Sequence, residues 1–193
     1  MGARTDTRVR MIQAAKVGFR ANGMVATGFS EVIERSGAAR GAIYHHFPGG
    51  KEELAIEVVR STSGNVETAI HALFAASPSP ACALAAAVEL VAAAVDAREG
   101  FGCAVAPAVL EAAGSAAILE AGNEAFARWQ AAIGDALGEQ FEIDTADLAA
   151  LFVSAIEGAL ILSRAEGTSE PIRRAGRALI ALLERVGPEE FGR

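Results

Sequence analysis

Residues 37–54 of the chain read GAARGAIYHHFPGGKEEL, and the order of residue types in this stretch decides the fold of the N-terminal part. Gly37 can adopt a positive φ, which a chain that reverses between two helices requires. Ile43 and Phe47 lie one helical turn apart, so both are predicted to face inward from a short helix. The following Pro48-Gly49-Gly50 ends that helix.

A longer helix is predicted before this stretch, from a cap at Thr5 or Asp6 to about Ala21. Its apolar residues recur at i, i+3 and i+7, the spacing of one buried face. They are Ile12, Ala15 and Phe19.

Two short helices joined by a tight turn and packed on a preceding helix form a helix-turn-helix. Thr27 is predicted to cap the first of them, which carries Val32 and Ile33, and the second spans about 39–47. The outer face of the second helix can reach base edges in a major groove. Its residues are Arg40, Gly41, Ala42, Tyr44, His45 and His46. Thr27, by its hydroxyl or backbone N–H, and Lys51, by its ammonium, are predicted to hold flanking phosphates.

Charge is unevenly divided along the chain. Residues 1–51 carry eight basic and three acidic side chains, a net +5, whereas the other 142 residues carry nine basic and 21 acidic side chains, a net −12. Because potential near a surface is set within a Debye length of about 8 to 10 Å, the N-terminal part can present an anion-binding face. An excess this small also occurs in ordinary surface composition, so charge alone leaves both interpretations open.

The rest of the chain is rich in alanine and lacks the alternation of strands, so an all-α protein of about nine helices is expected. Further helices are predicted at about 51–75, 81–97, 104–113, 116–139, 145–166 and 169–187. The expected organisation is a helix-turn-helix DNA-binding domain over 1–50 and a larger helical domain over 51–193.

Several classes of protein are not expected. Two cysteines rule out a disulfide framework, and no catalytic set or cofactor motif is present. Adjacent His45 and His46 point about 100° apart on a helix, so no metal site is predicted. The charged N-terminus lacks a signal-like apolar run, and the longest uncharged run, 68–88, is broken by prolines. A cytoplasmic protein without membrane contact is expected.

Two C-terminal segments combine apolar and small residues. Phe126, Trp129 and Ile133, at i, i+3 and i+7, either belong to the core or line a cavity. Small residues four apart in the helix over 145–166 let another helix approach closely, and the last helix has an apolar stripe, so a dimer seam is predicted. Its residues are Ser154, Ala155, Gly158, Ala159, Ile172, Gly176, Leu179, Ile180 and Leu183. The alternative is that both helices pack only within their own subunit.

The 37–54 stretch closely resembles the DNA-binding signature of the TetR family of bacterial transcription regulators. Gly102-Cys103 and the run 157–160 are similar to the LmrA-related subgroup of multidrug- and flavonoid-responsive repressors. The N-terminal resemblance covers about residues 7–55. This chain departs from the family pattern at Ile33, Ala38 and Ala39. Ala39 supplies no side-chain cap, and this weakens the start of the helix by about 1 kcal/mol.

This resemblance implies nine or so helices, a dimer, and double-stranded operator DNA as partner. It also implies that the domain over 51–193 serves effector binding and dimerisation, with a cavity for a small hydrophobic or aromatic effector. The candidate effector-binding residues are Phe74, Cys103, Leu110, Phe126, Trp129, Phe152 and Ile156. The expected function is a ligand-responsive repressor rather than an enzyme. An activator, or an all-α ligand carrier or small enzyme with an incidental basic N-terminus, remain the alternatives.

Overall fold

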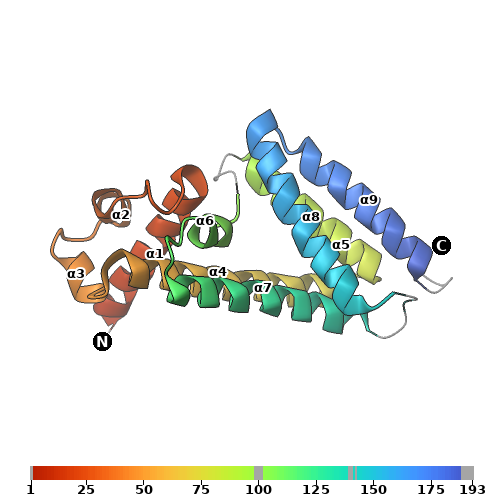
Figure 1. Ribbon diagram of the computed structural model, residues 1–193, viewed down its shortest axis with the longest axis horizontal. Coiled ribbons are helices and arrows are strands. Elements are labelled where there is room, and N and C mark those ends of the chain that lie inside the picture. Colours follow the sequence, from red (N-terminus) through yellow and green to blue (C-terminus); the bar gives the residue numbers. More distant parts are fainter. Residues whose placement is uncertain (1, 98–101, 139–140, 142, 188–193) are drawn as a thin grey trace. The chain divides into compact units, whose positions relative to one another are not determined.

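The computed structural model describes residues 2–97, 102–138, 141 and 143–187, and all regular structure in these ranges is helical (Figure 1). The described residues form nine helices in chain order. They are α1 (Gly2–Asn22), α2 (Phe29–Ser36), α3 (Ala42–His46), α4 (Gly50–Ala76), α5 (Pro80–Asp96), α6 (Val105–Leu110), α7 (Ala116–Leu137), α8 (Thr145–Glu166) and α9 (Glu170–Val186). The predicted all-α class is confirmed.

The helices divide between two compact units. The first unit comprises Met1–Gly64 with Cys103–Ala125, and the second comprises Asn65–Gly102 with Phe126–Arg193. The first therefore holds α1, α2, α3 and α6, the second holds α5, α8 and α9, and α4 and α7 contribute to both. The domain division at residue 50 predicted from the sequence remains a prediction about function.

The core of the first unit is built on one face of α1. The predicted stripe of Ile12, Ala15 and Phe19 is buried, and α2 packs against α1 (Figure 1). In α2 the fully buried residue is Val32, whereas Ile33 is half-buried. The sequence favoured Ile33 as the core contact of this helix, and the structure gives that place to its neighbour Val32, because an eight-residue helix carries too few turns to define its inner face.

Two predicted helix starts are wrong. α1 begins at Gly2, before the predicted caps at Thr5 or Asp6. α2 is preceded by Gly28 in extended conformation, and the hydroxyl of Thr27 donates instead to the carbonyl oxygen of Gly23 at 2.7 Å. The N-cap position of α2 belongs to Gly28, which has no side-chain oxygen, so no side chain caps the first N–H groups of this helix.

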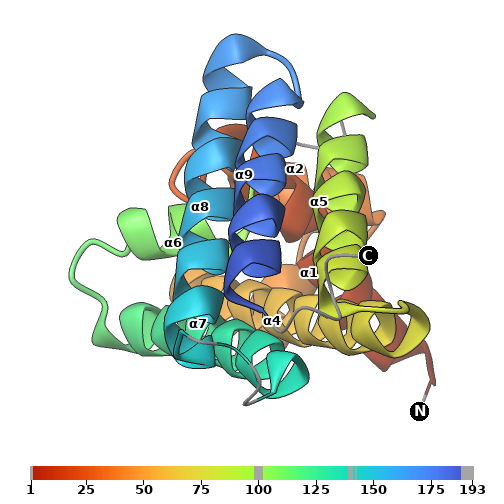
Figure 2. The ribbon, with the colours of Figure 1, turned by 90° about the vertical axis from the view of Figure 1, so that its right-hand side faces the viewer.

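In the second unit, α9 packs against both α5 and α8, and the three lie side by side (Figure 2). Gly176 makes the close approach to α5 possible, because a Cβ added there would lie 2.5 Å from Cγ1 of Val88. Ile172 and Leu183 are buried on the same side of α9. These three residues are therefore core residues of their own chain, which corrects their assignment to the dimer seam.

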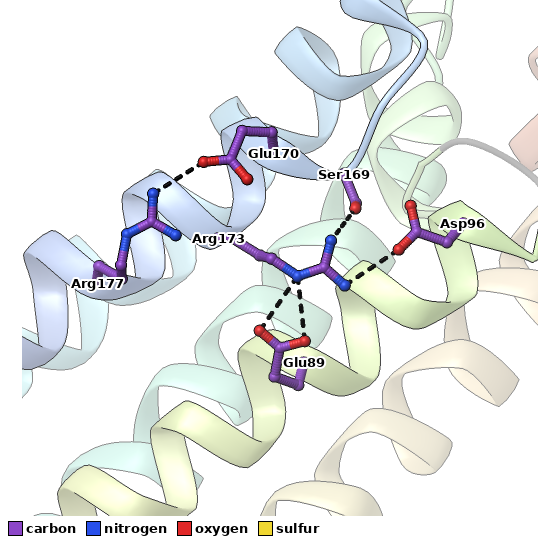
Figure 3. A network of polar contacts seen from close by, with 6 residues as sticks. All are labelled: Glu89, Asp96, Ser169, Glu170, Arg173 and Arg177. Atoms are coloured by element: carbon purple, nitrogen blue, oxygen red, sulfur yellow. Dashed lines mark hydrogen bonds and ion pairs between the residues drawn. The ribbon is translucent and has the colours of Figure 1, made fainter.

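Arg173 ties the first turns of α9 to α5 (Figure 3). Its guanidinium donates to Asp96 at 3.1 Å, to Glu89 at 3.2 Å and to the hydroxyl of Ser169. Hydrogen bonds from Ser169 and Arg173 lower the pKa of Asp96. The hydrogen bonds that Arg173 donates to Asp96 and Glu89 raise the pKa of its guanidinium. By contrast, Arg177 pairs with Glu170 of its own helix at 2.8 Å.

A charged side chain is buried in the first unit. Lys16 of α1 is almost inaccessible to solvent, because it lies among the residues of the helix's inner side. Burial, and to a smaller extent the nearby charge of Arg20, lower the pKa of its ammonium from 10.5 to about 8. Burial disfavours the charged form of a base, so this cation is retained at a cost to stability.

Exchanging Arg173 for alanine is expected to lower the melting temperature more than exchanging Arg177. Arg173→Ala removes contacts between two helices, whereas Arg177→Ala removes an equal charge and a contact within one helix. Thermal unfolding of the two variants at one protein concentration measures the difference. Equal melting temperatures would show that the cluster of Figure 3 does not hold α9 on α5.

The free energy of unfolding is expected to rise between pH 8 and 10.5 through Lys16. In this window the unfolded chain still binds the proton and the folded chain does not, so stability rises with pH, and the penalty is fully present below pH 8. Lys16→Met abolishes this gain. Urea unfolding of wild type and variant at pH 7 and 10 is the measurement, and a pH-independent difference between them would contradict the assignment.

Candidate nucleic-acid interface

The turn between α2 and α3 is fixed at three points. Gly37 has φ of 64°, as predicted, and its N–H donates to the carbonyl oxygen of Glu34 at 3.3 Å. The N–H of Ala38 donates to Ile33 at the same distance, so two last carbonyls of α2 are satisfied. From α1, Arg10 donates to the carbonyl oxygen of Ser36 at 2.7 Å.

α3 is shorter than the sequence predicts. It begins at Ala42 instead of about residue 39, and the preceding residues form a turn in which Ala42 N–H donates to Ala39 at 2.9 Å. Ala39 has no side-chain oxygen with which to begin a helix, which explains the later start. Ile43 and Phe47 are both fully buried, as predicted, and anchor α3 in the first unit.

The opposite side of α3 faces solvent. The side chain of Tyr44 is 67% exposed, and its ring meets that of Phe29 edge-on, with centroids 5.7 Å apart. Because Phe29 belongs to the first turn of α2, it restricts the orientation of the Tyr44 ring. His45 is also exposed and His46 is half-buried.

Arg40 and Gly41 occupy the exposed turn that leads into α3, and Ala42 is half-buried. A Cβ added at Gly41 would meet nothing within 4 Å, so space is open in front of this turn. Arg40 forms no ion pair with the residues that the structure describes, in contrast to Arg8, Arg10 and Arg35. Its guanidinium can therefore bind an external anion.

The first turn of α4 holds three neighbouring segments. The ammonium of Lys51 donates to the carbonyl oxygen of Val25 at 2.6 Å, between α1 and α2. The carboxylate of Glu53 accepts from the N–H of Gly49 at 2.8 Å, and that of Glu52 accepts from the hydroxyl of Ser115 before α7. Lys51 is half-buried, and an ammonium has three donors, so two remain for other acceptors.

Thr27 does not present its side chain to solvent. The residue is buried, its hydroxyl is bound to Gly23, and a Cβ at Gly18 would lie 2.4 Å from its methyl carbon. The predicted phosphate contact through the hydroxyl is therefore wrong for this conformation. The predicted contact through the backbone N–H of Thr27 stays a prediction.

Arg8 supports this site from α1. It pairs with Glu57 of α4 at 2.9 Å, and its guanidinium carbon lies 5.2 Å from the centroid of the Phe47 ring. Because Glu57 neutralises the charge of Arg8, this arginine contributes little to the positive potential outside the unit. Its contribution is to pack on Phe47 and to hold α1 against α4.

The candidate effector residues do not form a single described pocket. Phe126 and Trp129 pack edge-on with centroids 5.2 Å apart, and Trp129 is buried. Of the remaining candidates in the second unit, Phe152 is buried and Phe74 and Ile156 are half-buried. Trp129 and Ile133 are both buried in this conformation, and the choice between a core and an effector-binding role stays a prediction.

An apolar cavity of about 10 Å³ lies between α5, α7, α8 and α9. Its walls include Leu84, Ile133, Phe152, Leu179 and Leu183. This volume is room for about one water molecule, whereas ligand pockets measure about 300 to 1,000 Å³. Leu179, predicted to belong to the dimer seam, is half-buried and also lines this cavity.

Two effector candidates belong to the first unit. Cys103 is half-buried, and its sulfur accepts from the N–H of Val105 at 3.3 Å. Leu110, at the C-terminal end of α6, is 79% exposed. Such exposure is not that of a cavity wall, so the prediction for Leu110 is not supported.

α8 has an exposed apolar stripe on the side away from its core residues. Leu151, Ile161 and Leu162 are exposed, and Ser154 and Gly158 lie between them at helical spacing. Ala155 and Ala159 line an open groove beside this stripe, about 640 Å³ in volume, together with Arg174 of α9. Ile180 is half-buried. Of the α8 residues predicted for the seam, Ser154 and Gly158 are thus exposed, Ala155 is half-buried and Ala159 is buried, and their role in a dimer stays a prediction.

By length and composition alone, α8 would be long and apolar enough to cross a membrane, and it is the one such helix among the described residues. A helix with both a core side and an exposed apolar stripe meets the same criterion.

Three contributors to this interface were missed by sequence reasoning: Phe29, Ser115 and Glu111. For Phe29, the available signal in the sequence was its aromatic side chain, which packs against the ring of Tyr44. Glu111 accepts from the N–H of Val25 at 2.6 Å, and the separation of 86 in residue number leaves no sequence signal for the contact.

Comparison with known families matches both parts of the chain. Residues 11–58 match the model of bacterial regulatory proteins of the tetR family, and residues 80–178 match the C-terminal domain of LmrA/YxaF-like transcriptional regulators. The chain belongs to the TetR family. Its members are DNA-binding transcriptional regulators, and this chain is a TetR-type transcriptional regulator.

Relatives extend over almost the whole chain. The uncharacterized HTH-type transcriptional regulator YxaF of Bacillus subtilis is 31% identical, over 97% of this chain and 100% of its own. The HTH-type regulator LmrA of the same organism is 29% identical, over 93% and 98%. TetR-family regulators bind operator DNA and form dimers.

Solved structures share the fold. A TetR transcriptional regulator from Chloroflexus aurantiacus has a TM-score of 0.79 at 21% identity, covering 97% of this chain and 98% of its own. A TetR-family regulator from Agrobacterium tumefaciens has a TM-score of 0.81 at 17% identity, covering 96% and 100%. The helix-turn-helix followed by a helical C-terminal domain is thus the fold of this TetR-family chain.

Proposed function

We propose that this TetR-family chain is a dimeric repressor that binds a near-palindromic operator and is released by a small hydrophobic effector. The assignment of DNA recognition to α3 rests on which of its side chains are buried and which are exposed. Its two apolar residues are fully buried, and its opposite side presents Tyr44 and His45 to solvent beside Arg40. A rigid helix with one solvent-facing polar side is what major-groove readout requires.

Each candidate contact has a distinct chemical role. Arg40 can donate a bidentate pair to guanine or to a phosphate, and the open space before Gly41 lets a nucleic-acid backbone come close. Tyr44 and His45 can contact base edges. Lys51 and the backbone N–H of Thr27 are assigned to flanking phosphates, which fix position without reading sequence.

Dimerisation is assigned to the exposed stripe of α8. Leu151, Ile161 and Leu162 would leave water on pairing, and Ser154 and Gly158 would let the partner helix come close. A two-fold dimer places two copies of α3 on one face of the duplex. The operator should therefore be near-palindromic, with half-sites about one turn or a multiple apart.

Effector binding is assigned to the apolar interior of the second unit. The cavity beside Phe152 and Ile133 is too small for a drug-sized molecule, so an effector must bind a state in which this cluster has opened. A ligand shifts an equilibrium by its differential affinity for the two states. Release from DNA follows if the opened state holds the two α3 helices at the wrong spacing. The apolar lining favours hydrophobic or aromatic ligands.

Removing the Tyr44 side chain is expected to cost roughly 1 to 3 kcal/mol of operator binding and to relax specificity. Tyr44→Phe keeps the contact with Phe29, so a smaller loss isolates the hydroxyl. Leu119→Ala, at another exposed position of the first unit, is the control. Binding to a duplex enriched by the wild-type protein is the measurement, and unchanged affinity of Tyr44→Ala would remove Tyr44 from the reading face.

Gly158→Trp is expected to yield a folded monomer. A Cβ at Gly158 meets nothing within 4 Å in its own chain, whereas a bulky ring would hold the partner helix away. Ala146→Trp, at an exposed position about 120° around the same helix, is the matched control. Analytical ultracentrifugation should show a monomer for the first variant and a dimer for the second. If both variants were dimers, the dimer interface would not include Gly158.

A further inference from the structure

Both backbone polar groups of Val25 are held by charged side chains from distant segments of the first unit. Its N–H donates to the carboxylate of Glu111 at 2.6 Å, and its carbonyl oxygen accepts from the ammonium of Lys51 at 2.6 Å. The Val25 side chain is 65% exposed and adds little packing. One peptide segment between α1 and α2 is therefore positioned by a carboxylate on one side and an ammonium on the other.

The approach of Glu111 depends on a glycine. Gly23 has φ of 91°, and a Cβ added there would lie 2.4 Å from Oε1 of Glu111. Glu111 itself follows the last residue of α6, and its N–H donates to the carbonyl oxygen of Pro107 at 3.0 Å. The carboxylate thus projects from a fixed helix end into a gap that a larger residue at position 23 would close.

A second contact joins the same segments. The hydroxyl of Ser115, four residues after Glu111, donates to the carboxylate of Glu52, next to Lys51. The same oxygen of Ser115 accepts from the N–H of Ile118 at 3.2 Å and so caps α7. The turn between α6 and α7 is therefore attached both to the loop before α2 and to the first turn of α4.

From this arrangement we infer that Glu111 is a positioning residue for DNA binding, although it is acidic and faces no DNA contact itself. The inference rests on the proposed phosphate contact of Lys51. Glu111 fixes the Val25 segment, whose carbonyl oxygen fixes one of the three donors of the Lys51 ammonium and aims the others outward. Without Glu111, both the carbonyl and the ammonium lose their fixed orientation.

The change in DNA affinity expected on removal of Glu111 is opposite in sign to the change that its charge alone would cause. Removal of an acidic side chain from a DNA-binding protein raises its net positive charge, which by itself strengthens binding to any duplex. Removal of Glu111 is expected to weaken binding instead. Glu120, exposed on α7 in the same unit and without an ion pair to the described residues, provides the matched control with the same change of charge.

The experiment compares Glu111→Ala, Glu111→Gln and Glu120→Ala for binding to a random-sequence duplex of about 30 base pairs, across a salt series. Glu111→Ala should weaken binding about tenfold and reduce the slope of log K against log salt concentration by about one unit. Glu111→Gln keeps an acceptor oxygen for Val25, so a smaller loss is expected. Glu120→Ala should bind as tightly as the wild type or more tightly.

A Lys51→Ala background tests whether the effect passes through Lys51. There Glu111→Ala should cause no further loss, because the ammonium that it positions is already gone. Circular dichroism confirms folding of each variant, and Glu111→Gln serves in its place if Glu111→Ala does not fold. A loss that persists undiminished in the Lys51→Ala background, or equal behaviour of the Glu111 and Glu120 variants, overturns the inference. If the wild type itself shows no salt-dependent duplex binding, the proposed function has failed instead.

Discussion

Burial of Ile43 and Phe47 is the constraint on which the candidate interface depends. α3 has five residues, far fewer than a helix needs to persist alone in water, so its conformation and direction are imposed by what it buries. Val32 of α2 and Phe19 of α1 are buried in the same unit. Loss of this core would leave Tyr44 and Arg40 on a flexible turn, with affinity for polyanions but no fixed arrangement to read bases.

The acidic chain is compatible with DNA binding because its charges are segregated and partly neutralised. Several arginines of the first unit pair with carboxylates and hold helices together, as Arg8 does with Glu57 and Arg35 with Glu31. Arg40, in the turn before α3, and Lys51, at the start of α4, are the cations that we propose to meet the DNA. The acidic Glu111 contributes by fixing the segment that orients a cation, so the sign of a residue's charge does not determine its effect on DNA affinity.

Local rules predicted the helix-turn-helix well. The Gly37 turn, the inward Ile43 and Phe47, and the stripe of α1 follow from conformational freedom and helical spacing, which a sequence displays directly. Thr27 was misjudged as a cap because capping depends on the local backbone, which here makes Gly28 the N-cap, and α3 begins later than predicted because Ala39 supplies no cap. On α9, a stripe that contains Ile172 and Gly176 fits a dimer seam and an internal packing face equally well, and the close approach of Val88 decided between them. The Glu111–Val25 contact had no local signal at all.

The central claim, that α3 reads DNA in a dimer, is tested most directly by selecting duplexes from a random-sequence library with the purified wild-type protein at physiological salt. The account predicts enrichment of an inverted repeat whose half-sites lie about 10 to 10.5 base pairs, or a multiple of that, apart. Binding to it should resist a scrambled competitor. Failure of a folded dimer to enrich any sequence would contradict the claim.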